Sequence, residues 1–172
     1  MKTASIIALG FLLLIMQSTI AVFIPLEVFV PNAALAVVIY MGLHSYSAGY
    51  GAVVSFVIGY LMDTFAGSPL GMYTFVAVAV FLLSRTAALR LFLKGWIFEI
   101  ALTLAWATVA GVLGLLVRGL FDQDFRSLLT HLKIVFFKAA ATAVVAPLVF
   151  RAMAWLERVT AKRKAEGKVF RG

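Results

Sequence analysis

The sequence predicts an all-α integral membrane protein, a bundle of six or alternatively five transmembrane helices. Of its 172 residues, 64% are hydrophobic and only 13% are charged, whereas soluble domains average about 45–50% and about 25%. A globule of this size has too little interior to remove that much apolar surface from water. At roughly 20 residues per crossing, the apolar segments and their loops leave room for five or six helices.

The charge and the residue types exclude several classes of function. The net charge is +8, from 15 Lys and Arg against 7 Asp and Glu. These basic residues lie near the ends of apolar segments, as membrane topology requires, so we expect no nucleic acid partner. The chain has no cysteine, which excludes disulfides and thiolate chemistry. Its two histidines are far apart in the sequence, so we expect no metal site and no cofactor.

The first apolar segment runs from Ala4 to Ile24 and follows Lys2. A cleaved signal peptide is the alternative, with a poor cleavage site at Thr19-Ile20-Ala21. The apolar run continues beyond that site, so we expect a retained transmembrane helix.

The second apolar stretch, residues 33–62, is too long for one helix, at about 45 Å. It is interrupted by the polar sequence His44-Ser-Tyr-Ser. We therefore expect two helices, at 33–43 and 47–63. Both are short for a hydrocarbon core of about 30 Å, which implies a thinned bilayer, a tilt or a re-entrant hairpin.

Three further segments have the length and hydropathy of transmembrane helices: 70–90, 96–117 and 134–156. We expect a kink at Pro147, because proline cannot donate the helical hydrogen bond. The chain then divides into a single transmembrane domain, 1–156, and a basic tail, 157–172.

Residues 118–133, before the last helix, are amphipathic. One helical face would carry the apolar side chains Phe121, Phe125, Leu128, Leu129 and Leu132. We expect a short helix lying in the outer membrane interface, whose apolar face contacts lipid or a partner arriving from outside.

The orientation follows from the distribution of Lys and Arg. With six helices and a cytoplasmic N-terminus, 11 of the 15 lie on the cytoplasmic side and the remaining 4 outside. The positive-inside rule therefore predicts that both termini are cytoplasmic. The tail from Arg158 to Arg171 holds six Lys or Arg and one acid, Glu166, and we expect it to lie against anionic headgroups.

No catalytic residue is expected. The chain has no Gly-x-x-x-x-Gly-Lys loop, no His-Glu-x-x-His pair and no Gly-x-Ser nucleophile. His131 is near Asp122, Asp124 and Ser127 in the sequence, but a triad needs one rigid geometry. A surface segment of this kind does not provide it.

Two acids fall within apolar segments, where ionisable groups are costly. Glu99 is close in sequence to Lys94 and Arg90, so we expect an ion pair at the cytoplasmic edge. Asp63 precedes a glycine-rich turn, and we expect it to accept hydrogen bonds from the free N–H groups of that turn. A proton carrier is the alternative role for Asp63.

Small residues recur every fourth position on three predicted helices: Ser47, Gly51, Ser55 and Gly59; Thr103, Ala107 and Gly111, with Ala110 and Gly114 beside them; and Ala4 and Ala8. Such stripes let helices approach closely in lipid. For the helix at 47–63, packing within the bundle and packing against a partner's transmembrane helix both remain open.

A second group of residues forms a spaced motif: Pro31, Asn32, Gly59, Asp63, Gly67, Pro69, Leu70 and Gly71. With the length and hydropathy of the chain, this motif resembles the bacterial rod shape-determining protein MreD family. The resemblance implies a non-enzymatic scaffold subunit of the cell-elongation machinery in the bacterial inner (cytoplasmic) membrane. It implies MreC as the direct partner, with MreB and the elongation glycosyltransferase and transpeptidase, which build peptidoglycan, as further partners.

The rival function is transport. The substrate-binding subunits of energy-coupling-factor vitamin transporters have a similar architecture, and they resemble this chain in an Ala-x-x-x-Ala on the first helix, matched by Ala4 and Ala8. A vitamin site needs several convergent polar groups in one pocket. The outer half of this chain shows few.

Overall fold

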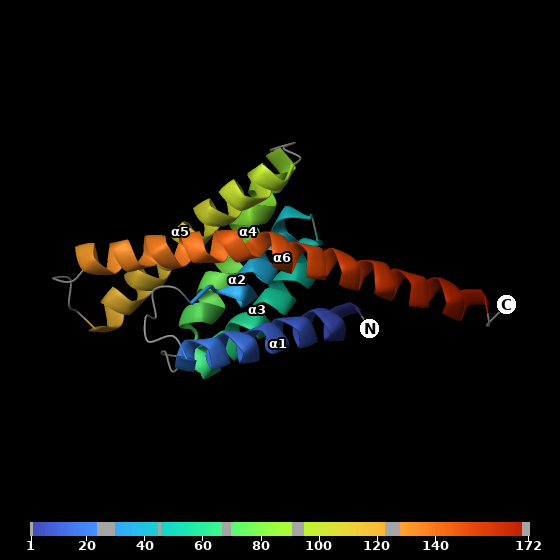
Figure 1. Cartoon of the computed structure of the whole chain (residues 1–172), viewed down its shortest axis with the longest axis horizontal. Coiled ribbons are helices and arrows are strands. Elements are labelled where there is room, and N and C mark those ends of the chain that lie inside the picture. The colour runs from blue at the N-terminus through green and yellow to red at the C-terminus, as the bar shows by residue number, and fades with distance from the viewer. Residues whose placement is uncertain are drawn as a thin grey trace.

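The computed structural model describes residues 2–23, 30–44, 46–66, 70–90, 95–122 and 128–169. These residues form six helices and no strand (Figure 1): α1 Lys2–Phe23, α2 Ala33–Leu43, α3 Ala48–Ala66, α4 Met72–Arg90, α5 Trp96–Asp122 and α6 Leu128–Val169. The predicted all-α class is confirmed.

Five of these helices are long and apolar enough to cross a membrane, namely α1, α3, α4, α5 and α6. The remaining helix, α2, has only 11 residues, which gives about 16 Å against a hydrocarbon core of about 30 Å. The described residues thus form six helices, of which five have spanning length.

The short helix α2 forms the centre of the bundle. Ten consecutive residues, Ala33 to Gly42, are buried, and α2 contacts each of the other five helices. A helix that is apolar on every face needs protein or lipid around it, and the burial of α2 shows that here it is protein. The other helices therefore form a shell around α2.

The helix α3 is not short. It has 19 residues, about 28 Å, so the expected length of 47–63 was wrong at its far end. Asp63 was expected to be the last residue of this helix, but α3 continues for almost one more turn to Ala66.

The amphipathic segment 118–133 does not form one interfacial helix. Its first residues continue α5 to Asp122, and its last residues begin α6 at Leu128. Residues 123–127 lie outside the described part of the chain. The prediction of a separate interfacial helix was wrong because the backbone hydrogen bonds of α5 and α6 extend into the amphipathic sequence.

The helix α6 has 42 residues and continues through Pro147 to Val169. The residue boundary expected at 156 is thus not the end of a helix, since most of the basic tail is helical. Figure 1 shows this part of α6 projecting beyond the other helices, with both chain ends at the same end of the bundle.

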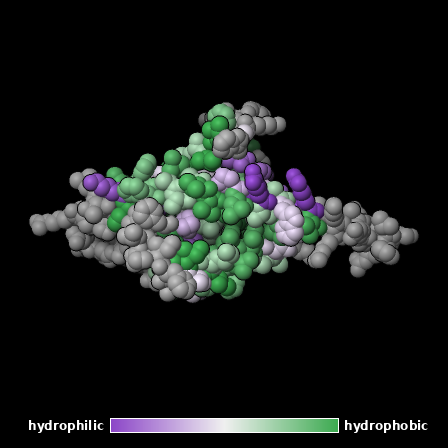
Figure 2. Space-filling view, viewed as in Figure 1, coloured by the Kyte–Doolittle hydropathy of each residue, from purple (hydrophilic) through white to green (hydrophobic). Residues whose placement is uncertain are grey.

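In the face seen in Figure 2, the coloured atoms are largely hydrophobic, and only a few side chains are strongly hydrophilic. Large apolar side chains are exposed on several helices, including Leu12, Val53, Leu148 and Trp155. This surface suits contact with lipid tails.

Candidate functional site

Polar side chains form hydrogen-bonded clusters between helices at three places in the described part of the chain: the contact between α3 and α4, the end of α2 near α6, and the start of α2. Polar groups inside a membrane protein are costly without hydrogen bonds. These three places are therefore where a functional site would be built.

At the first place, Asp63 of α3 caps the start of α4. The side chain is 1% exposed. Its oxygens accept hydrogen bonds from the backbone N–H groups of Gly71 at 2.9 Å, Tyr73 at 2.7 Å and Thr74 at 3.1 Å. The Thr74 hydroxyl donates to Oδ2 at 2.6 Å. Helix N-termini have N–H groups without intrahelical partners, so the geometry is that of a cap rather than an exposed proton carrier.

The backbone around Asp63 depends on two glycines. Gly71 has φ +99°, a conformation that side chains with a Cβ rarely adopt. At Gly59, an added Cβ would lie 2.6 Å from Thr74 Cα and 2.8 Å from the Tyr73 carbonyl oxygen. We call Gly59, Asp63 and residues 71–74 the α3–α4 junction. Of the other motif residues, Leu70 is 75% exposed, and Gly67 and Pro69 lie outside the described residues.

The small-residue stripe of α3 faces α4. Gly51, Ser55 and Gly59 are buried, and a Cβ at Gly51 would lie 2.0 Å from the ring of Phe81. The contact is internal, so these residues are not available to a partner. Ser47 precedes α3 and is exposed.

The other small residues are divided between inside and outside. On α5, Thr103, Ala107 and Ala110 are buried, and a Cβ at Gly111 would lie 2.3 Å from Val135 Cγ1 of α6. On α1, Ala4 and Ala8 are exposed. The partner candidates Phe121, Phe125, Leu128 and Leu129 have side chains outside the described part of the chain.

At the second place, two tyrosines bind one carboxylate. The hydroxyl of Tyr40, at the end of α2, donates to Glu157 Oε2 at 3.2 Å, and the hydroxyl of Tyr46 donates to the other oxygen. The His44 ring stacks on Tyr40 with centroids 3.8 Å apart. The Arg85 Nε donates to the Tyr46 carbonyl oxygen at 2.8 Å. The cluster thus joins α2, the turn after it, α4 and α6.

Burial and the hydrogen bond to Glu157 raise the pKa of Tyr46 above its usual value of 10.0. The hydroxyl therefore stays protonated at neutral pH and remains a donor to the carboxylate. Sequence reasoning missed this cluster, because Glu157 was assigned to the tail. The tyrosine in the polar interruption at 44–47 was a signal, but its partner is 111 residues away.

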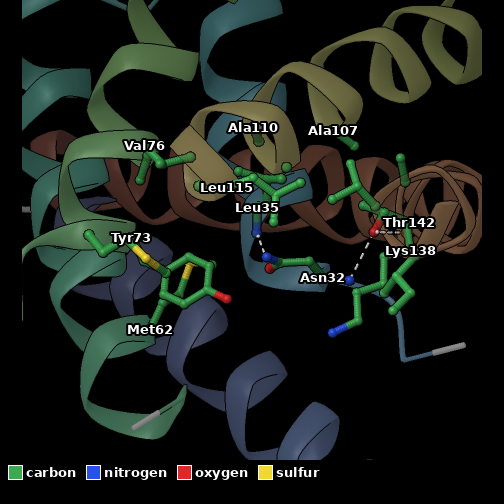
Figure 3. Close-up of a pocket in the computed structure, with 17 residues that line it drawn as sticks. Asn32, Leu35, Met62, Tyr73, Val76, Ala107, Ala110, Leu115, Lys138 and Thr142 are labelled. Atoms are coloured by element: carbon green, nitrogen blue, oxygen red, sulfur yellow. Dashed lines mark hydrogen bonds between the residues drawn. The ribbon is translucent and has the colours of Figure 1, made fainter. Parts of the chain in front are cut away.

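At the third place, Asn32 connects three helices (Figure 3). Its Oδ1 accepts a hydrogen bond from the Leu35 N–H at 3.0 Å, and so caps α2. Its own N–H donates to the Thr142 hydroxyl of α6 at 2.9 Å. The next N–H, of Ala33, donates to Gln17 Oε1 of α1 at 3.1 Å. The Pro31-Asn32 motif therefore marks the point where α1, α2 and α6 meet.

A pocket of about 300 Å³ lies beside Asn32. Its walls come from the starts of α2 and α4, the end of α3, the middle of α5 and the first half of α6, and Lys138 of α6 lines it (Figure 3). Elsewhere in the described residues, no three His, Asp or Glu side chains come together as metal ligands.

The family model of the rod shape-determining protein MreD matches residues 2–156. The chain belongs to the MreD family. This family membership and the five helices of spanning length make it a multi-pass membrane protein of rod shape determination. No curated protein and no solved structure matches the chain.

Proposed function

We propose that this MreD-family chain is a non-enzymatic scaffold subunit of the bacterial elongation complex, which binds MreC and helps to organise peptidoglycan synthesis. The observation that carries the proposal is the family match over residues 2–156. The polar clusters support it, because their hydrogen bonds hold helices together. Asp63 and Glu157 both bind groups of the bundle itself.

We place the protein in the inner membrane with both termini cytoplasmic. The positions of both chain ends at one end of the bundle (Figure 1) support a common side for the two termini. The distribution of Lys and Arg supports the cytoplasm as that side. MreB and the glycosyltransferase and transpeptidase of elongation are the further partners of this proposal.

The docking face for MreC is proposed to be the outer face of α1. The stripe of α3 is buried against α4, so it cannot receive another helix. On α1, Ala4 and Ala8 are exposed together with Phe11 and Leu12. Small residues beside large ones allow a transmembrane helix to approach closely and to interlock its side chains.

Photo-crosslinking in membranes that contain MreC tests both the partner and the face. A crosslinking residue at Ala8 should give an MreC adduct, whereas one at the exposed Val53 of α3 or Val144 of α6 should not. Absence of MreC from adducts and from a pull-down of the solubilised protein would refute the proposed partner. An adduct from Val144 and not from Ala8 would refute the proposed face alone.

The same pull-down separates this function from vitamin transport. The family match favours the shape-determination function, because it covers the transmembrane region as a whole. Recovery of transporter ATPases in place of elongation proteins would reverse that preference.

A further inference from the structure

The pocket beside Asn32 is hollowed by small residues. Its apolar wall includes Ala107, Ala110 and Gly114 of α5 and Ala139 of α6. A Cβ added at Gly114 would have no atom within 4 Å. Its volume of about 300 Å³ is at the lower end of the range for small-molecule sites, which is enough for part of one acyl chain and too little for a whole phospholipid.

The polar groups of the pocket are mostly engaged already. The Thr142 hydroxyl accepts from the Asn32 N–H at 2.9 Å and donates to the Lys138 carbonyl oxygen at 2.8 Å. The Asn32 side-chain oxygen accepts from the Leu35 N–H at 3.0 Å. A polar vitamin needs several free donors and acceptors that converge on it, and these groups do not supply them.

The Lys138 side chain differs from these groups. It lines the pocket, and its ammonium makes no hydrogen bond or ion pair with any part of the chain that the structure describes. It lies six residues inside the apolar span Leu132–Thr160, about 9 Å along the helix axis. An ionised lysine at such a depth is costly without a counter-charge. The pocket thus combines an apolar wall with a cation that has no counter-charge among the described residues.

We propose that this pocket binds one anionic phospholipid. The lipid phosphate pairs with the Lys138 ammonium, and one acyl chain lies against the small residues of α5. A net negative headgroup complements the lysine, whereas the headgroup of phosphatidylethanolamine carries its own ammonium and gains less. The site is independent of MreC, which is assigned to α1 on another face.

Native mass spectrometry tests the proposal on the full chain, in micelles doped with equal amounts of phosphatidylglycerol and phosphatidylethanolamine. We expect one retained phosphatidylglycerol per protein. Lys138→Gln should reduce its retention about five- to ten-fold, since one basic residue near a lipid surface contributes about 1 kcal/mol. Lys138→Arg should restore it.

Gly114→Leu tests the apolar part, because Gly114 lines the pocket and a Cβ added there would meet no atom within 4 Å. This variant should also lose the lipid while keeping the size-exclusion profile of the native protein. Arg151→Gln is the matched control, since Arg151 is an exposed cation of the same helix, and it should retain the lipid.

Three results would overturn the proposal. One is equal phosphatidylglycerol retention in the native protein, Lys138→Gln and Gly114→Leu. Another is equal retention of the two lipids by the native protein. The third is a pair of observations: millimolar inorganic phosphate displaces the lipid, and Gly114→Leu does not change lipid retention. Together they would mean that the site binds the phosphate group alone.

Discussion

Replacing Asp63 with alanine should strongly destabilise the protein. The carboxylate is buried and accepts four hydrogen bonds, three from backbone N–H groups and one from a hydroxyl. Alanine would leave these donors at a helix N-terminus without that acceptor, in a place that water does not reach.

The size of the effect follows from the number of bonds. Hydrogen bonds inside membrane proteins contribute on average about 0.6 kcal/mol each, which sets a lower estimate of about 2 kcal/mol for the four. Bonds to a charged acceptor contribute about 1.5 kcal/mol or more, which sets an upper estimate of about 6 kcal/mol. Either value is a large part of a typical stability of about 5–15 kcal/mol.

Two milder variants grade the effect. Asp63→Asn keeps one acceptor oxygen but places an amide donor against backbone donors, so it should lose about half as much as alanine. Thr74→Val removes only the hydroxyl bond of 2.6 Å and should lose about 1 kcal/mol. Thermal unfolding of the detergent-solubilised proteins, followed by size exclusion, ranks the four proteins.

The order native, Thr74→Val, Asp63→Asn, Asp63→Ala is therefore expected for falling midpoint temperature. A midpoint of Asp63→Ala equal to that of the native protein would refute the reasoning. It would mean that water or other groups replace the carboxylate at no cost.

Three other results are expected. Leucine at Gly51 would overlap the ring of Phe81 on α4, so Gly51→Leu should lower the amount of protein in membranes, measured by immunoblot. The control Gly49→Leu should not lower it, because a Cβ at Gly49 meets no atom within 4 Å. Equal amounts of the two variants would contradict the internal contact of Gly51. The pKa of Tyr46 is raised in the folded protein, so its neutral hydroxyl stabilises the fold fully below about pH 10, and this stabilisation is lost as the pH rises further. The stability of Tyr46→Phe should therefore fall less steeply above about pH 10 than that of the native protein in unfolding experiments. An equally steep fall in both proteins would contradict the role of the hydroxyl. A single cysteine at Lys168 should resist an impermeant thiol reagent added outside spheroplasts, and efficient labelling would reverse the proposed orientation.

Hydropathy predicted the helices well, because a bilayer requires apolar segments of a set length. The sequence 33–43 predicted α2 with the bounds that the structure has. Hydropathy could not predict that α2 is enclosed by the others, since a lipid-facing helix and a protein-enclosed helix are equally apolar in sequence.

The polar contacts divide by their distance along the chain. Asp63 binds groups 8–11 residues away, so the turn composition was sufficient to predict a cap. The contact of Tyr46 with Glu157 depends on how α2 and α6 pack, and no local pattern shows that. The pocket at Lys138 was missed for the same reason, because its walls come from five helices.

The enclosed position of α2 has a consequence for the order of synthesis. Its start and the turn after it are held by Thr142 and Glu157, which follow them by 110 and 111 residues. At about 5–20 residues per second, a ribosome needs roughly 5 to 20 s to reach these partners. During that interval α2 is too short to span the bilayer and has no completed shell. The core therefore cannot close before α6 has been synthesised, and a nascent chain terminated before α6 would leave the centre of the molecule open.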